Sequence, residues 1–150
     1  MMTNYNEKYL PAFVELNREW ITTHFVLEPM DLVQLENPQE SILNLGGEIF
    51  FVLEEGAAVG TCAMVPHGPD CYELAKMAVS PKKRGKGYGD QLMRAAINWA
   101  KEKKAKRIMI LSNTILEPAI ALYLKHGFQV VSLGPHPDYR RSDIELILEF

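Results

Sequence analysis

The pattern of apolar and polar positions predicts two helical regions in the first third of the chain. Over residues 7–22 apolar side chains recur near helical spacing, which is typical of an amphipathic helix. A shorter helical region is expected over residues 29–45, where Pro38 interrupts it and two glycines, Gly46 and Gly47, end it. The chain therefore begins with helices and turns to strands only after residue 47.

Short extended runs follow these helices. The segments 48–55 and 58–65 are rich in β-branched and apolar residues and are joined across Gly56, which predicts a hairpin. A third strand is expected over residues 71–80, and Pro81 ends it. The middle of the chain thus predicts neighbouring antiparallel strands.

Helices and strands alternate in the second half. Residues 87–106 carry an apolar face and a lysine-rich last turn, which favours a helix, and residues 117–127 predict another, with Pro near its start and Gly at its end. Strands are expected over 107–112, 128–133 and 143–150. Antiparallel hairpins followed by alternating elements indicate a mixed α/β fold, a mostly antiparallel mixed sheet flanked by helices. Because no repeat or linker interrupts this order, one domain over residues 1–150 is expected.

Composition narrows the function classes. The chain has 150 residues, of which 47% are hydrophobic, enough for one core, and its net charge of −3 disfavours binding to nucleic acid or to a membrane surface. The two cysteines, Cys62 and Cys71, and the four histidines lack metal-ligand spacing, so no metal site is expected. Without a signal-like or membrane-spanning run, the sequence predicts a cytoplasmic protein with reduced thiols.

The stretch SPKKRGKGYG, residues 80–89, indicates an anion site. A strand, a glycine turn and a helix in this order present the free N–H groups of a first helical turn to an anion. Gly85, Gly87 and Gly89 lack Cβ atoms, and Arg84 and Lys86 add positive charge. The spacing matches neither the dinucleotide fingerprint nor the P-loop. A solvated basic turn that caps a helix is the alternative that the spacing leaves open.

Two motifs together resemble the GCN5-related N-acetyltransferase (GNAT) family. The pattern R-x-x-G-x-G at 84–89 opens a helix, and PAIALYLKHGF at 118–128 is similar to the family's A-x-x-x-Y-x-x-x-G-F segment. The family often has Asn three residues before that Ala, where this chain has Leu116, and Asn113 is the candidate replacement. The residues in register with the second motif are Ala119, Tyr123, Gly127 and Phe128.

The resemblance implies acetyl-CoA as co-substrate. Main-chain amides of the glycine turn would hold its diphosphate, and the strands over 71–80 and 107–112 would splay apart to admit the pantetheine arm. A strand N–H near Met77 or Ala78 would stabilise the oxyanion of the tetrahedral intermediate. The cofactor-binding residues implied are Met77, Ala78, Val79, Arg84, Gly85, Lys86, Gly87, Tyr88, Gly89, Asn113, Ala119 and Tyr123.

Acyl transfer to an amine needs a base and an acid. Glu73, on the strand before the cofactor segment, is the candidate base, with a solvent-facing carboxylate or a partner of Lys76 as the alternative. Tyr123 is the candidate acid for the leaving thiolate, with a packed aromatic ring as the alternative. We expect direct transfer in a ternary complex, and an acyl carrier at Cys71 is the rival route.

The resemblance therefore implies an N-acetyltransferase acting on a primary amine of a small molecule or a protein. Two other classes are a non-catalytic acetyl-CoA or CoA sensor and a nucleic-acid-binding protein, and the acidic balance disfavours the latter. A homodimer through the terminal strand is left open. Candidates for acceptor contact are Trp20, Phe25, Glu28, Asp138, Tyr139 and Arg141, for which core packing or a plain surface loop is the alternative.

Overall fold

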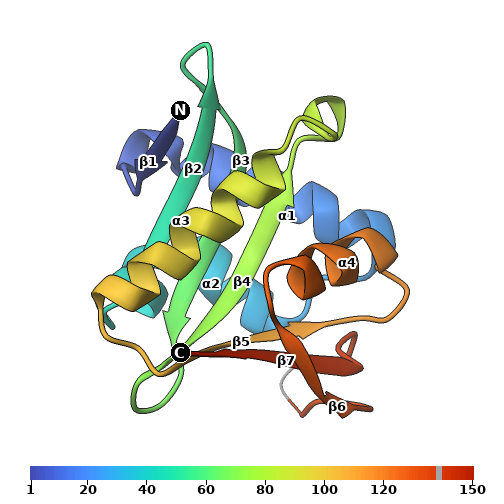
Figure 1. Ribbon diagram of the computed structural model, residues 1–150. Coiled ribbons are helices and arrows are strands. Elements are labelled where there is room, and N and C mark those ends of the chain that lie inside the picture. The colour runs from blue at the N-terminus through green and yellow to red at the C-terminus, as the bar shows by residue number, and fades with distance from the viewer. Residues whose placement is uncertain (138–139) are drawn as a thin grey trace.

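A single seven-stranded sheet organises the molecule (Figure 1). The computed structural model describes residues 1–137 and 140–150. The strands lie in the order β1-β2-β3-β4-β5-β7-β6, and every neighbouring pair is antiparallel except β4 and β5. The strands are β1 (Met2–Asn4), β2 (Glu48–Glu54), β3 (Ala57–Pro66), β4 (Cys71–Val79), β5 (Arg107–Ser112), β6 (Gln129–Leu133) and β7 (Ile144–Glu149). This confirms the predicted mixed, mostly antiparallel sheet.

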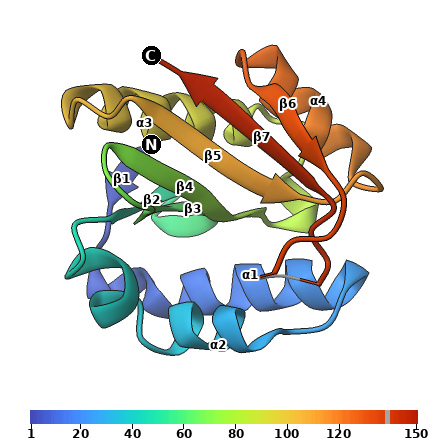
Figure 2. The same ribbon diagram turned by 90° about the horizontal axis from the view of Figure 1, so that it is seen from below.

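Helices cover both faces of the sheet, as Figure 2 shows. The pair α1 and α2 lies on one face, and α3 and α4 lie on the other. The α-helices are α1 (Leu10–His24), α2 (Pro29–Glu36), α3 (Tyr88–Glu102) and α4 (Glu117–Lys125), and short 3-10 or π turns span Glu7–Tyr9, Gln39–Leu43 and Pro81–Lys83. Within the described residues, no helix is long and apolar enough to cross a bilayer.

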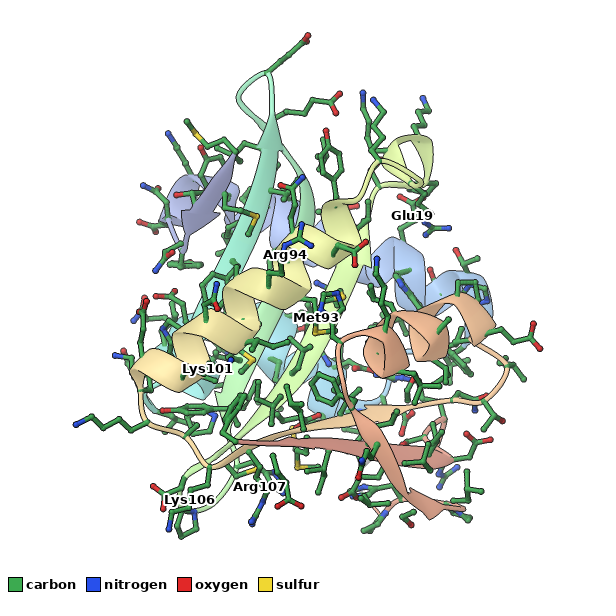
Figure 3. All side chains as sticks on the ribbon, in the orientation of Figure 1. Glu19, Met93, Arg94, Lys101, Lys106 and Arg107 are labelled. Carbon is green, nitrogen blue, oxygen red and sulfur yellow. The ribbon has the colours of Figure 1, made fainter. Side chains whose placement is uncertain are left out.

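Each face of the sheet has its own apolar core. Phe13 of α1, Leu35 of α2 and Phe51 of β2 are fully or almost fully buried on one face. On the other face α3 buries Met93 and directs Arg94 to solvent, in keeping with its amphipathic sequence (Figure 3). At roughly 25 cal/mol for each Å² of apolar surface removed from water, these two layers hold the helices against the sheet.

A β-bulge in β4 shapes the middle of the sheet. Ala75 pairs with Ala63 and Ala78 pairs with Thr61, so two β4 residues, Lys76 and Met77, lie opposite one β3 residue. Lys76 adopts a positive φ of 54° there. Because a bulge bends its strand and increases the twist, β4 turns away from its parallel neighbour beyond this point.

The parallel pair β4 and β5 is consequently short. Its pairing runs from Cys71 opposite Arg107 to Glu73 opposite Met109, although β4 continues to Val79 and β5 to Ser112. Figure 1 shows the two strands diverging beyond the shared segment. The predicted splayed strand pair is confirmed.

Differences from the sequence prediction are confined to element ends and one strand. The expected helix over 7–22 is a 3-10 turn followed by α1, and the helix expected over 87–106 ends at Glu102. The three-residue strand β1 has no sequence signal, because so short a segment cannot show an alternating pattern. The interruption at Pro38 is confirmed, since α2 ends before it and a π-helical turn follows.

Candidate active site

A cleft occupies the gap between the diverging strands. Met77 of β4, Leu111 of β5 and Tyr123 of α4 contribute to its wall, so three separate elements meet there. The other lining residues are Asn17, Trp20, Ile21, Phe25, Glu73, Leu74, Ala75, Lys76, Ile110, Ser112, Asn113, Leu116, Arg141 and Ser142. The cleft thus has an apolar wall from α1 and a polar set of groups from β4 and the segment before β7.

The glycine loop connects β4 to α3. Gly85 and Gly87 have φ angles of +79° and +82°, a region that glycine enters without strain. Gly87 is the N-cap of α3, and the first intrahelical bond runs from the Gln91 N–H to its carbonyl oxygen, 3.1 Å away. The N–H groups of residues 88–90 precede that bond, so they are available to an anion at the positive end of the helix dipole.

Glu54, at the end of β2, anchors this loop. Its carboxylate accepts hydrogen bonds from Lys83 and from the Tyr88 hydroxyl, and the Lys86 ammonium lies 3.5 Å from it. The bond from Lys83, followed by that from Tyr88, lowers the pKa of Glu54 to about 2. The side chain of Tyr88, expected at the cofactor, is therefore directed to β2, while its backbone N–H stays in the loop.

The start of α3 is tied to the end of α4. Asp90 accepts hydrogen bonds from Lys125 at 2.9 Å and pairs with the His126 ring at 2.8 Å. A Cβ on Gly89 would lie 3.3 Å from Leu122, so the two helices approach closely at this glycine. These contacts hold α4, and with it Tyr123, beside the glycine loop.

Tyr123 faces the cleft from α4. Burial raises its pKa to about 12, and a hydrogen bond with Ser112 lowers it only in part. The phenol is therefore protonated throughout the neutral range, the state required of a proton donor. The ring also packs against Phe128, with centroids 6.3 Å apart, so the aromatic packing alternative describes part of its environment.

Glu73 lines the same cleft at the last paired position of β4. Glu73 is only 9% exposed. Burial lowers the pKa of Lys76, and the negative charge of Glu73 opposes part of this effect. The Lys76 ammonium itself binds Asp31 at 2.9 Å. Glu73 thus stands between the paired part of the sheet and the open cleft.

Asp31, in the first turn of α2, is fully buried. Arg141 donates to both of its carboxylate oxygens at 2.6 Å, and the Glu28 N–H donates at 2.8 Å. Burial alone would raise the pKa of Asp31, but the bonds from Arg141 and the charge and bond of Lys76 outweigh it and hold the pKa at about 2. One carboxylate therefore binds both cations.

Glu28 joins two segments that are far apart in sequence. It caps α2, and its carboxylate accepts from the backbone N–H groups of Arg140 and Arg141 at 2.8 and 3.3 Å. A shallow groove adjoins the cleft along the same segments and includes Phe25, Glu28 and Arg141. Four of the residues expected on the acceptor side are thus gathered near the end of α1 and the start of α2: Trp20, Phe25, Glu28 and Arg141.

The other predicted site residues do not all lie in the cleft. Asn113 lines the cleft, but its side chain donates to the Arg141 carbonyl oxygen at 2.6 Å and accepts from the Ile115 N–H. Ala119 lies in the first turn of α4, outside the set of described lining residues. The candidates Asp138 and Tyr139 lie outside the described residues. Over the described ranges, no group of three or more His, Cys, Asp or Glu side chains is arranged to hold a metal ion.

Neither cysteine has an environment that would activate its thiol. Cys62 is fully buried, and burial raises its pKa far above the ordinary value. Burial also raises the pKa of Cys71, against a smaller opposing effect of Arg107. A raised pKa reduces the thiolate that a covalent route would need.

Sequence reasoning missed several of these groups. Glu54 and Ser142 carry no recognisable motif, because their roles depend on tertiary neighbours. Asp31 was detectable in part, since Glu28 and Asp31 form a capping box, with acidic residues three positions apart before an apolar run. Its ion pairs with Lys76 and Arg141 span 45 and 110 positions and have no local signal.

The family model described as "Acetyltransferase (GNAT) family" matches residues 10–128. Among curated relatives, the uncharacterized N-acetyltransferase YjgM of Escherichia coli strain K12 is 36% identical over 97 residues, which are 62% of this chain and 54% of that protein. The chain spans less than two thirds of the length of the curated relatives it matches.

Solved structures of similar fold cover the whole chain. A GNAT-family acetyltransferase from Staphylococcus aureus Mu50 superposes with a TM-score of 0.89 at 21% identity, covering 99% of this chain and 98% of its own. A Salmonella typhimurium acetyltransferase, yncA, whose structure contains its cofactor acetyl-CoA, has a TM-score of 0.81 at 20% identity. The match covers 99% of this chain and 93% of yncA. At these identities the likeness concerns the fold.

Proposed function

Because the chain belongs to the GNAT family of acetyltransferases, we propose that it transfers the acetyl group of acetyl-CoA to a primary amine. The observation that carries the proposal is the gap between β4 and β5. The same strand that opens the gap leads into the glycine loop, and Glu73 and Tyr123 both line the cleft. A thioester held in this gap would have a base and an acid within one cleft.

The glycine loop supplies the diphosphate site in this proposal. The N–H groups at the start of α3 would donate to the phosphate oxygens, and Arg84 and Lys86 would add charge at the rim. Beyond the last pair with β5, the edge of β4 from Met77 to Val79 has its backbone groups open to the pantetheine amides, as an added strand would use them. The coenzyme would then run along β4 toward Glu73.

The proposed chemistry is direct transfer. Glu73 takes a proton from the acceptor ammonium, directly or through water, and the neutral amine attacks the thioester carbonyl carbon. A backbone N–H at Met77 or Ala78 donates to the carbonyl oxygen as it gains charge. As the new C–N bond forms and the C–S bond breaks, Tyr123 donates its phenolic proton to the departing sulfur. The acetylated nitrogen releases its second proton to water, and water returns a proton to the Tyr123 phenolate.

Thiol release tests the proposal. The purified protein is mixed with acetyl-CoA and a panel of amines, and free CoA thiol is measured together with thermal stabilisation by acetyl-CoA. We expect a raised Tm and amine-dependent thiol release. A raised Tm without turnover for any amine would favour the non-catalytic sensor, and no change in Tm at high acetyl-CoA concentration would contradict both functions.

Gly87→Ala is expected to weaken acetyl-CoA binding about tenfold. The left-handed φ of +82° costs an L-residue about 1–2 kcal/mol, so the loop would shift and misdirect its N–H groups. Isothermal titration calorimetry measures the change. Gly68→Ala is the matched control, because Gly68 has a φ of +76° in the turn between β3 and β4, and its Kd should stay at the wild-type value. Equal Kd values for both variants would contradict a role of the loop in binding.

Tyr123→Phe is expected to lower kcat by about 10–100-fold while Kd for acetyl-CoA stays unchanged. The substitution removes the proton donor and keeps the ring that packs on Phe128. Steady-state kinetics and calorimetry separate the two effects. Tyr72→Phe, on β4 against Trp99, removes a hydroxyl outside the cleft and should keep the wild-type kcat. An unchanged kcat for Tyr123→Phe would exclude the phenol as the acid.

Cys71→Ala is expected to retain kcat within about twofold of wild type, because the transfer needs no acyl carrier and the Cys71 pKa is raised rather than lowered. Mass spectrometry after mixing with acetyl-CoA alone should detect no acetylated protein. Loss of activity together with an acetyl adduct on the wild-type chain would establish the covalent route.

A further inference from the structure

The polar groups of the cleft differ in what they can still bind. Among the described residues, two cations line it, Lys76 and Arg141, and both are held by the buried carboxylate of Asp31. Over residues 1–137 and 140–150, the Asp31 carboxylate accepts four hydrogen bonds: one from Lys76, two from Arg141 and one from the Glu28 N–H. Asp31 therefore already balances part of the charge of both cations, which weakens their attraction for an entering carboxylate.

Groups that can accept hydrogen bonds also line the cleft. Ser142 lines the cleft and is only 3% exposed. Its hydroxyl has no hydrogen-bond partner among the described residues. Asn17 also lines the cleft, and its Nδ2 already donates to the Phe13 carbonyl oxygen at 2.9 Å, which leaves its oxygen as an acceptor. Glu73 adds a carboxylate. An ammonium group has three N–H donors and no acceptor, which matches this set.

The charged side chains around the cleft also favour a cation over an anion. Among the described residues, three carboxylates, Glu28, Asp31 and Glu73, interact with two cations, Lys76 and Arg141. This set of five groups has a net charge of −1 when all are ionised. Asp31 stays ionised in the neutral range because its pKa is held at about 2. A monocation entering the cleft would neutralise the group, whereas an anion would add to its charge.

Apolar and aromatic side chains line the cleft as well. Trp20 lies in α1, and Phe25 is the C-cap of that helix. Their rings are nearly parallel, with an interplanar angle of 9° and 6.4 Å between centroids. Ile21 also lines the cleft from α1, and Leu116 lines it from the N-cap of α4. Such a surface binds hydrocarbon or aromatic groups, and an aromatic face also attracts a cation.

We propose that the acetyl acceptor is a primary monoamine with an apolar or aromatic body and no carboxylate beside the amino group. This inference rests on the proposed function and names the substrate class of the same cleft. The ammonium would lie among Glu73, Asn17 and Ser142, and the body would lie against Trp20 and Phe25. Asp31 is a positioning residue, because it balances the charge of Lys76 and Arg141 that would otherwise attract a carboxylate.

Three amines that share one phenyl body test the class. 2-Phenylethylamine, L-phenylalaninol and L-phenylalanine differ only in the group beside the amine, which is hydrogen, hydroxymethyl or carboxylate. We expect kcat/KM for L-phenylalanine to be at least about a hundredfold below that of 2-phenylethylamine, with L-phenylalaninol within about tenfold of it. A kcat/KM for L-phenylalanine within tenfold of that for 2-phenylethylamine would overturn the proposal. A kcat/KM for L-phenylalaninol as low as that for L-phenylalanine would also overturn it, because the size of the added group, and not its charge, would then explain the preference.

Asp31→Asn tests the positioning role. With the carboxylate gone, the Lys76 and Arg141 cations face the acceptor, so the preference for 2-phenylethylamine over L-phenylalanine should fall at least about tenfold, whatever the change in total activity. Glu36→Gln removes an exposed charge at the other end of α2 and should keep the wild-type ratio. An unchanged ratio in a folded Asp31→Asn protein would overturn the role of Asp31, and the wild-type comparison stands if the variant does not fold.

Failure of this inference is distinguishable from failure of the proposed function. Glu73-dependent acetylation of other amines, with all three phenyl compounds refused, would overturn the acceptor class alone. Absence of thiol release with every amine tested would overturn both.

Discussion

Glu73→Gln is expected to lower kcat/KM for the amine about 100- to 1000-fold near neutral pH. The acceptor arrives as an ammonium ion, since alkyl amines have pKa values of roughly 10.4, and only the neutral amine has the lone pair that attacks the thioester. Gln has nearly the shape of Glu but cannot accept the proton. Steady-state measurement of CoA thiol release gives the ratio.

The pH profile separates a base from a merely structural carboxylate. The Glu73→Gln variant depends on amine that is already neutral in solution, so its kcat/KM should rise about tenfold with each pH unit toward the amine pKa, and the deficit should narrow. Glu102→Gln, on the exposed last turn of α3, is the control and should follow the wild-type profile. A deficit that stays constant across the pH range would argue against proton transfer to Glu73.

Asp31→Ala is expected to destabilise the fold by about 3–5 kcal/mol, equivalent to a fall in Tm of roughly 10 °C for a chain of this size. The substitution leaves the ammonium of Lys76 buried with its main counterion removed, and it also removes both Arg141 bonds. Chemical denaturation and calorimetry measure the two quantities. Glu36→Gln, on the same helix, should change stability by less than about 0.5 kcal/mol.

A double substitution identifies the cause of that loss. Replacing Lys76 by Met in the Asp31→Leu background removes both charges of the pair and should recover much of the lost stability, because an apolar pair avoids the cost of an uncompensated buried charge. Additive losses would contradict the ion pair as the source.

The loss of folding stability at low pH is an independent test of the ion pairs of Asp31. Its pKa is about 2 in the folded protein against an ordinary value of 3.8, so its contribution is complete above about pH 4 and is lost as the pH falls toward 2. Wild type should lose roughly 2 kcal/mol relative to Asp31→Asn over this window.

The elements whose signals are local were predictable. The hairpin across Gly56, the amphipathic α3 and the turn after β4 follow from residue periodicity and from glycine and proline positions, and the structure confirms them. The family was predictable from two motifs at fixed spacing, and the family model confirms it. The splayed strands followed from that resemblance rather than from the residues of β4.

The acceptor side was not predictable to the same extent. The bulge at Lys76 and Met77 depends on pairing with β3, and residues in a bulge look like any other strand residues. The pairing of Asp31 with Lys76 and Arg141 joins three distant segments, so no window of the sequence contains it. Trp20 and Phe25 were singled out only by their place in the chain, and the structure puts both on the cleft wall.

A crystal structure with acetyl-CoA tests the central claim most directly. We expect the diphosphate oxygens within hydrogen-bond distance of the N–H groups of residues 85–90, the pantetheine arm along Met77–Val79, and the acetyl carbonyl carbon between Glu73 and Tyr123. A coenzyme whose diphosphate binds away from the glycine loop, or whose acetyl group lies outside the gap between β4 and β5, would contradict the account.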